Sequence, residues 1–109
     1  MTFSADNSRI VDLWLETRVN PHTRDCYRRD AMRLVAHAAK PLTSLTLRDL
    51  QSFVQSLSDS GLAPVSRLRS IAAIRSLFAF CHRMRFIDSN PAAELPLPAY
   101  ETPGIAPTR

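Results

Sequence analysis

The stretch APVSRLRSIAAIRSLFAFC, residues 63–81, decides the fold of this 109-residue chain. Apolar side chains recur in it at three- and four-residue intervals from Ile71 to Cys81, which places them on one side of an α-helix at about 100° per residue. Pro64 suits the first turn of a helix, where its missing N–H would have no partner anyway. The stretch therefore predicts a helix over about residues 64–84 with one side in the core.

The rest of the chain shows further helical segments and no convincing two-residue alternation of the kind that half-buried β-strands show. Side-chain oxygens precede the apolar periodic runs, as helix N-caps do. We expect a first helix that begins after the capping oxygens of Asp6, Asn7 and Ser8 and ends near Asn20. A second helix is capped by Thr23 and ends before Pro41, and a third extends from a capping box at Thr46 and Asp49 to Gly61. A short turn follows, in which Asn90 is the cap and Pro91 takes the first position. This pattern predicts an all-α bundle of four to five short helices.

Proline is concentrated at the C-terminal end, where five of the 8 prolines lie after residue 90. Such a segment does not continue a helix and has little apolar surface to bury. We therefore expect residues 1–98 to form one helical domain and residues 99–109 to form an extended linker.

The formal net charge of +4 and a sequence pI near 9.8 favour an anionic partner. All the basic residues except Lys40 are arginines, whose planar guanidinium groups suit phosphates. No apolar run is long enough for a signal sequence or a membrane span, so we expect a cytoplasmic chain without a membrane partner. Cys26 and Cys81 fall in predicted helices without metal-ligand spacing, which predicts buried reduced thiols and no metal or cofactor.

The arginines of residues 64–84 differ in their expected surroundings. Arg69, Ser76 and Arg83 lie opposite the core side of the helical wheel, so the two arginines should be solvated. Arg67 lies near the core side but in the first turn, from where its side chain can reach outward. Arg75 must extend past the rim of the core or pair with a carboxylate. These positions fit either a solubilising helix face or an anion-binding surface.

The second helical segment carries its own basic cluster. Arg24 and Arg28 are one turn apart on one flank, and Arg29 and Arg33 are one turn apart on another. Two neighbouring helix N-termini with hydroxyl side chains would add backbone donors for phosphates. The candidate nucleic-acid-binding residues are Thr23, Arg24, Arg28, Arg29, Lys40, Ser66, Arg67, Arg69 and Ser70. This hypothesis requires their cations to share one exterior strip that carboxylates do not mask.

Four motifs occur in order along the chain. TRDCYRRD begins at Thr23, LTSLTLRDLQSF at Leu42, SRLRSIAAIRSLFAF at Ser66 and FIDSNPA at Phe86. They resemble, in turn, the Thr–Tyr–Asp helix, the threonine-capped Asp–Leu helix, the arginine- and aromatic-rich fourth helix and the Asn–Pro exit of one family. That family is the N-terminal, core-binding, SAM-like domain of tyrosine recombinases, or phage integrases. The resemblance covers about residues 10–97.

The resemblance implies an orthogonal helical bundle that grips one side of a recombination half-site in double-stranded DNA. A separate C-terminal catalytic domain, absent from this chain, would grip the other side. It further implies that the second and fourth helices face the DNA, so that Arg67 and Arg69 contact the duplex while Arg75 is structural. Other recombinase protomers would be partners on DNA, and the chain would be a monomer without it.

A pattern that mimics the catalytic residues of the family is also present. His82 and Arg85 form H-x-x-R, with Tyr100 downstream, whereas the family uses arginines, a histidine and a nucleophilic tyrosine of the second domain. We interpret the match as chance, because the first two lie at the end of a packing helix and no folded context surrounds the tyrosine. The chain is therefore expected to be a non-catalytic fragment of a recombinase.

Two alternatives stay open at this point. A helical protein-interaction domain could dock a neighbour through Phe80, Met84 and Phe86. A freestanding helix-turn-helix regulator would place its recognition helix after the turn at residues 61–64, but it would lack a dimerisation element. Among the other aromatic residues, we expect Tyr27 and Trp14 in the core, with the indole N–H of the latter bonded to an edge carbonyl.

Overall fold

A computed structural model describes the backbone of residues 3–95 and the side chains from Asp6 onward within that range. The elements in chain order are α1 (Phe3–Leu15), α2 (Pro21–Ala38), the 3₁₀ turn η1 (Leu42–Ser44), α3 (Leu47–Asp59), α4 (Pro64–Arg83) and the 3₁₀ turn η2 (Pro91–Glu94). The described residues contain no strand, which confirms the all-α prediction. The expected linker at residues 99–109, and Tyr100 with it, lies outside the described residues.

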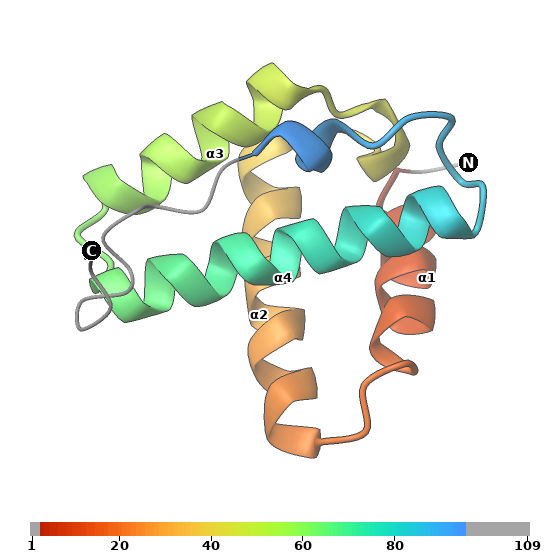
Figure 1. Cartoon of the computed structure of the whole chain (residues 1–109), viewed down its shortest axis with the longest axis horizontal. Coiled ribbons are helices and arrows are strands. Elements are labelled where there is room, and N and C mark those ends of the chain that lie inside the picture. Colours follow the sequence, from red (N-terminus) through yellow and green to blue (C-terminus); the bar gives the residue numbers. More distant parts are fainter. Residues whose placement is uncertain (1–2, 96–109) are drawn as a thin grey trace, which may run out of the picture.

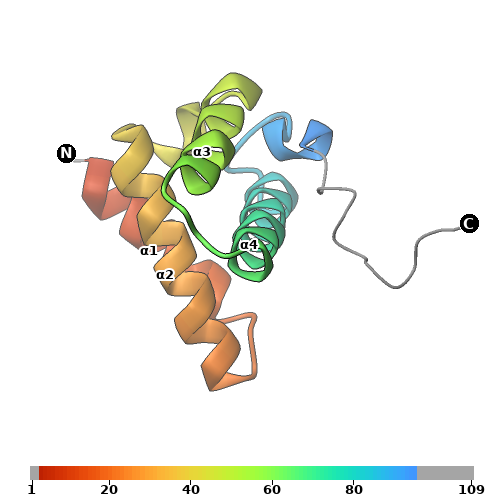
Figure 2. The same ribbon diagram turned by 90° about the vertical axis from the view of Figure 1, so that its left-hand side faces the viewer.

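The helices form an orthogonal arrangement around α4 (Figure 1). α1 and α2 run side by side, and α4 crosses both of them on one side, while α3 lies across the end of α2 that Ala38 closes. The turned view shows the α1–α2 pair on one side of the molecule and α4 with η2 on the other (Figure 2). The crossing of α2 by α4 is the feature that positions the candidate site.

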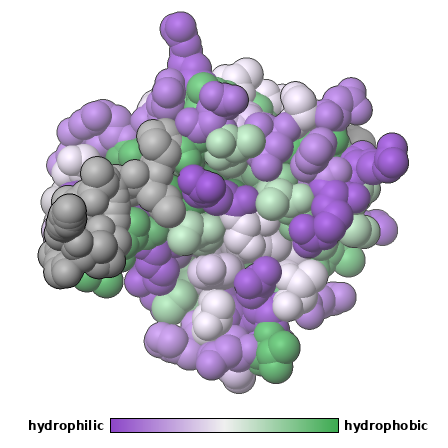
Figure 3. Space-filling model, viewed as in Figure 1, coloured by the Kyte–Doolittle hydropathy of each residue, from purple (hydrophilic) through white to green (hydrophobic). Residues whose placement is uncertain are grey.

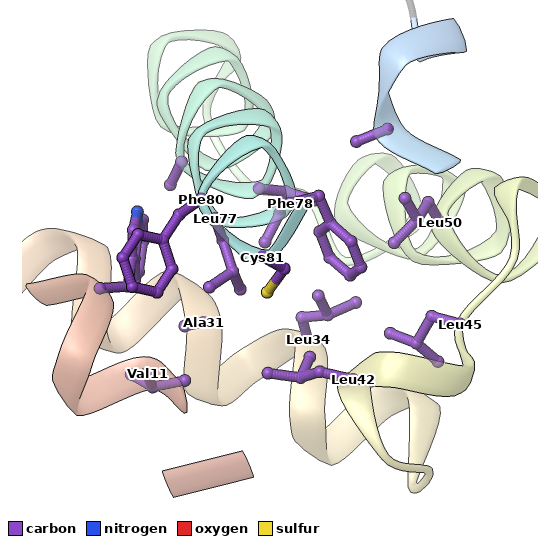
Figure 4. Close-up of a cluster of buried hydrophobic side chains, with 14 of the residues drawn as sticks. Val11, Ala31, Leu34, Leu42, Leu45, Leu50, Leu77, Phe78, Phe80 and Cys81 are labelled. Atoms are coloured by element: carbon purple, nitrogen blue, oxygen red, sulfur yellow. The ribbon is translucent and has the colours of Figure 1, made fainter. Parts of the chain in front are cut away.

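The core is built around α4, as the periodicity of its sequence predicts. Ile71, Ile74 and Phe78 are almost completely buried, and Cys81 lies among them. Side chains from α1, α2, η1 and α3 meet this side of α4 (Figure 4). Both thiols are buried and unpaired by disulfide, as expected. Desolvation raises the pKa of the Cys81 thiol to about 11, so this group stays protonated and unreactive at neutral pH.

The boundaries of α1 differ from the prediction. The helix begins at Phe3 instead of after the predicted capping residues, and it ends at Leu15 instead of near Asn20. Asn7 is not a cap, because it lies inside α1, where its side chain is buried and bonds to another segment. Its Oδ1 accepts from the N–H of Leu42 at 2.8 Å, and its Nδ2 donates to the carbonyl of Lys40 at 3.2 Å. Asn7 thus ties α1 to the loop that follows α2.

The start of α2 also differs from the prediction. The N-cap is Asn20, whose Oδ1 accepts from the N–H groups of His22 and Thr23 at 2.8 and 3.1 Å, with Pro21 in the first turn. Thr23 therefore lies inside the helix and is not its cap. Pro21 follows Asn20 directly, and the fixed φ of a proline favours the first position of a helix. Sequence reasoning assigned the cap to a later residue with an equally suitable oxygen.

The limits of α3 agree with the prediction. Thr46 and Asp49 form a reciprocal capping box, in which the side chain of each accepts from the backbone N–H of the other. The hydrogen bond from the N–H of Thr46 and the nearby ammonium of Lys40 lower the pKa of Asp49 below its usual value. At the other end, Gly61 adopts φ +80 and closes a Schellman motif, in which the N–H of Leu62 donates to the carbonyl of Leu57.

Trp14 is a packing anchor, as expected, but its polar partner is different. The buried indole stacks on Tyr27 at a centroid distance of 5.2 Å, and its N–H donates to Oγ of Ser76 at 3.1 Å instead of to a carbonyl. The helical wheel places Ser76 opposite the core side of α4, yet it is only half exposed and faces α1. The same aromatic pair is extended by Arg18, whose guanidinium lies 5.6 Å from the Tyr27 ring centroid.

Arg75 has the structural role that was expected for it. Its side chain is half-buried, and Nη1 donates to the carbonyl of Leu95 at 2.8 Å, so the partner is a backbone oxygen and not a carboxylate. This bond joins α4 to the end of η2. The predicted turn there is confirmed, because Asn90 caps η2 by accepting from the N–H of Ala92 at 2.9 Å, with Pro91 at its first position.

The apolar patch expected at the end of α4 is smaller than the sequence indicated. Phe80 is buried with 5% exposure and packs edge-on against Phe86, at a centroid distance of 6.2 Å. Met84 and Phe86 are exposed, at 51% and 36%. Two of the three predicted patch residues therefore remain on the surface.

Candidate nucleic-acid interface

Basic charge is distributed unevenly among the helices. α4 contains four arginines and no acidic residue, and α2 contains four arginines and two aspartates. By contrast, α1 and α3 each contain one more acidic than basic residue. An anionic partner is therefore attracted more strongly to α2 and α4 than to α1 and α3.

A buried carboxylate lies at this crossing and joins the two helices. Asp30 of α2 is completely buried, and its Oδ2 and Oδ1 accept from Nε and Nη2 of Arg69 at 3.1 and 3.2 Å. The buried hydroxyl of Ser70 also donates to Oδ1, at 2.7 Å. The hydrogen bonds from Arg69 to Asp30 raise the pKa of the Arg69 guanidinium. The arrangement fixes the first turns of α4 on the middle of α2.

A second guanidinium approaches the same carboxylate. Nη1 of Arg33 lies 3.7 Å from Oδ1 of Asp30, which is close enough for ionic attraction. This nitrogen is buried and has no hydrogen-bond partner among the described residues. Two arginines therefore share one carboxylate, and we refer to Asp30, Arg33, Arg69 and Ser70 as the Asp30 cluster.

This cluster changes the expected roles of two predicted site residues. Ser70 is buried and its hydroxyl is committed to Asp30, so it does not lie on an exterior surface. Arg69 was expected to be solvated, but its side chain is only 33% exposed. Its Nη1 makes none of the bonds to Asp30, so only the outer edge of this guanidinium remains for a ligand.

On the other flank of α2, two predicted residues face α1. Arg24 and Arg28 line a shallow hollow of about 310 Å³ together with Asp12 and Glu16. Nη1 of Arg28 lies 3.2 Å from Oδ1 of Asp12, with both side chains more than half exposed. An exposed ion pair of this kind contributes about 0–1 kcal/mol, so a phosphate can replace the aspartate at little cost. The two arginines are therefore available, but on a different side of α2 from the Asp30 cluster.

The remaining predicted residues are spread along both helices. Lys40 lies beyond the far end of α2 and pairs with Asp49 at 3.1 Å, so the structure does not bring it to the crossing. Arg29 is exposed and makes no ion pair among the described residues. Arg67 is half exposed, and its Nη1 donates to the carbonyl of Leu62 at 3.0 Å. Thr23 and Ser66 are half exposed near the helix starts.

The two helix N-termini differ in what they offer a phosphate. At the start of α2, the side chain of Asn20 already occupies two N–H groups. At the start of α4, Ala63 provides no side-chain cap, so the first N–H groups of this helix have no side-chain acceptor. Only the N-terminus of α4 therefore fits the predicted role of an open anion-binding end.

Sequence reasoning missed the central residue of the site. Asp30 was not among the candidate residues, but it is the acceptor that organises the two arginines. The signal in the sequence was its position, because Asp30 falls beside Ala31 and Leu34 on the buried stripe of α2. A carboxylate at a core position requires a cationic or hydroxyl partner.

Residues 10–84 match the model of the phage integrase N-terminal SAM-like domain. The chain belongs to this family. It is 34% identical over 101 residues to the tyrosine recombinase XerC of Xanthomonas campestris pv. campestris, and 35% identical over 100 residues to that of Xylella fastidiosa. A third XerC, from Oceanobacillus iheyensis, is 30% identical over 95 residues. No solved structure is significantly similar.

These alignments cover 89%, 84% and 84% of this chain, but only 31%, 34% and 31% of the respective recombinases. This SAM-like domain therefore spans about a third of the length of the relatives it matches. The described residues contain no cluster of three or more metal-ligating side chains, and none of their helices is long and apolar enough to cross a membrane.

Proposed function

We propose that this chain is the DNA-binding, non-catalytic domain of a site-specific tyrosine recombinase and that it grips one side of a recombination half-site. The observation that carries the proposal is the concentration of basic charge on α2 and α4, the two helices that cross at the Asp30 cluster. A duplex that lies against this crossing meets guanidinium groups from both helices, and its phosphates suit their planar geometry.

The strength of each ion pair decides which side chains contact phosphates. Arg24, Arg29 and Arg67 have no carboxylate partner among the described residues, and Arg28 has only an exposed one. Arg24 and Arg28 face α1, so they contact only a duplex that extends past the crossing onto that flank of α2. Arg69 contributes through its outer edge while Asp30 holds the rest of its guanidinium. The proposed contacts therefore exclude Ser70, which is buried, and Lys40, which lies at the distant end of α2.

The parent protein is, in this proposal, a recombinase that breaks and rejoins DNA with residues outside this chain. His82 and Arg85 are exposed at the end of α4 and occupy no enclosed site with a nucleophile among the described residues. This arrangement supports the interpretation of their H-x-x-R pattern as chance. We therefore propose that this domain takes no part in catalysis.

Salt-dependent binding of a duplex tests the proposed function. We expect the chain to bind duplex DNA with a dissociation constant on the order of micromolar at low salt, because only one side of the half-site is gripped. Arg29→Ala should make the slope of log K against log salt less negative by about 0.9, the value for one lost phosphate contact. Fluorescence anisotropy over a salt series measures both quantities.

Arg48→Ala is the matched control, since Arg48 is an exposed arginine on α3, away from the α2–α4 crossing. Its substitution makes the same change in net charge and should leave the slope unchanged. If the wild-type chain shows no salt-dependent duplex binding even at low ionic strength, the proposed function is wrong. Equal slope changes for both variants would place the interface elsewhere.

A protein-interaction surface is the second candidate function, and the exposure of Met84 and Phe86 at the end of α4 favours it. The two functions are compatible, because protomers on DNA could meet through this end of the domain. Light scattering separates them. A monomer without DNA is the expected result, whereas a stable oligomer without DNA would favour the second function.

A further inference from the structure

The backbone at the end of α4 is strained at an arginine. Arg85 has φ +64, in the left-handed region that favours glycine. Its N–H donates to the carbonyl of His82 at 3.0 Å, and the N–H of Phe86 donates to the carbonyl of Cys81 at 2.9 Å. These bonds form a second Schellman motif, in which Arg85 occupies the position that Gly61 occupies after α3.

A glycine at this position would be the more stable choice, because a side chain in the left-handed region clashes with the backbone. The chain uses glycine at the corresponding position after α3, where a Cβ would meet no atom within 4 Å and only the backbone angle matters. The same strain occurs at the exposed Ala39, which has φ +54 and no functional group, so strain alone does not indicate a use for the side chain. Arg85 differs from Ala39 because its side chain carries a charge, which directs attention to a site beside it.

Such a site is present next to Arg85. A surface cavity of about 330 Å³ is lined by His82, Arg83, Arg85, Ile87 and Asp88. The lining thus contains two arginines, a histidine and one carboxylate, around a hollow large enough for a phosphate group. The hydropathy surface shows strongly hydrophilic residues on the right-hand side of the molecule, where Figure 1 places this end of α4 (Figure 3).

The cations of this cavity are not committed to carboxylates. Within residues 6–95, neither Arg83 nor Arg85 makes an ion pair, unlike Arg28 and Arg69. The guanidinium of Arg83 lies 5.9 Å from the centroid of the Phe80 ring, a contact that holds its side chain without satisfying its charge. The negative end of the α4 dipole accounts for basic residues in the last turn, but Arg85 lies beyond that turn.

We propose that His82, Arg83 and Arg85 form a second phosphate-binding site, which contacts the backbone of the same DNA duplex. The inference rests on the proposed function and adds a contact at the opposite end of α4 from Arg67 and Arg69. Fourteen residues separate Arg69 from Arg83, which corresponds to about 21 Å along a helix. The ligand is a phosphodiester group, and no base is read at this site.

Arg85→Gly tests the site in a way that loss of folding cannot imitate. Removing the strained side chain should raise the melting temperature, while removing the cation should weaken duplex binding and make the salt slope less negative by about 0.9. Ala39→Gly is the matched control. Ala39 is an exposed residue at the end of α2 with φ +54, so its substitution relieves the same kind of strain without a change in charge. It should raise the melting temperature and leave binding unchanged.

Arg85→Lys keeps both the charge and the strain, so this variant should retain the wild-type salt slope. Three outcomes would overturn the inference: an Arg85→Gly variant that binds with the wild-type slope, an Ala39→Gly variant that loses binding to the same extent, or an Arg85→Lys variant that behaves like Arg85→Gly. In each of them the wild-type chain still binds DNA, so the proposed function survives. Failure of the wild-type chain to bind duplex DNA at any salt concentration would remove both proposals.

Discussion

Asp30→Ala should lower the free energy of unfolding by about 2–4 kcal/mol. The substitution removes the acceptor of three hydrogen bonds and leaves the buried hydroxyl of Ser70 without its partner. It also leaves the charges of Arg33 and Arg69 close together at the α2–α4 crossing. These side chains are 38% and 33% exposed, which lets water compensate part of the loss and places the effect below the highest values for broken buried pairs. Urea denaturation followed by circular dichroism measures the change.

Asp25→Ala provides the control, because Asp25 is an exposed aspartate on the same helix and makes no ion pair among the described residues. It should change stability by no more than about 0.5 kcal/mol. Asp30→Asn should fall between the two, since an amide still accepts a bond from Ser70 but carries no charge for the arginines. Equal effects of the substitutions at Asp25 and Asp30 would show that the cluster does not hold the helices together.

The elements that sequence predicted closely are those whose ends are specified by near neighbours. α3 is the clearest case, because Thr46 and Asp49 are three residues apart and Gly61 alone determines the backbone angle at the other end. The start of α2 was placed wrongly because Asn20 and Thr23 both offer a suitable oxygen within one turn. Local chemistry predicts that a helix starts there, but it does not choose between two adjacent caps.

Features that depend on partners distant in sequence could not be predicted from local patterns. Asn7 bonds to residues more than thirty positions away, and Trp14 finds Ser76 at a separation of 62 residues. The wheel of α4 placed Ser76 with the solvated arginines, because the wheel of one helix does not show which neighbours cover it. Ser76 is partly covered because α1 packs on that side of α4. The same reason explains why Arg69 is half-buried at Asp30.

For the candidate site, sequence predicted which helices are basic but not which cations are available. Asp12, Asp30 and Asp49 each pair with one of the predicted residues, so the condition that carboxylates should not mask the strip is met only in part. The three pairs differ in how far their side chains are exposed to solvent. The pair of Arg28 with Asp12 is exposed on both sides, so a phosphate can replace the carboxylate, whereas the bonds to the buried Asp30 are not readily exchanged. The pair of Lys40 with Asp49 lies between these cases, because Asp49 is only 22% exposed.

Trp14→Ala should lower the free energy of unfolding by about 3–5 kcal/mol, a large part of the total stability of a domain of this size. The indole is completely buried, stacks on Tyr27 of α2 and bonds to Ser76 of α4, so its removal opens a cavity where three helices meet. Because Trp14 is the single tryptophan of the chain, circular dichroism has to replace fluorescence as the measurement.

A double-mutant cycle separates the packing of Trp14 from its hydrogen bond. Trp14→Phe keeps an aromatic ring beside Tyr27 but removes the N–H that Ser76 accepts, and Ser76→Ala removes the acceptor. Each single substitution should cost about 1 kcal/mol or somewhat more, and the double variant should cost less than their sum by about 0.5–1.5 kcal/mol. Strict additivity would mean that the bond contributes nothing and that packing alone joins α1 to α4. A coupling of the expected size would show that the bond at Ser76 fixes α4 to α1, in addition to the bonds from Arg69 that connect α4 to α2.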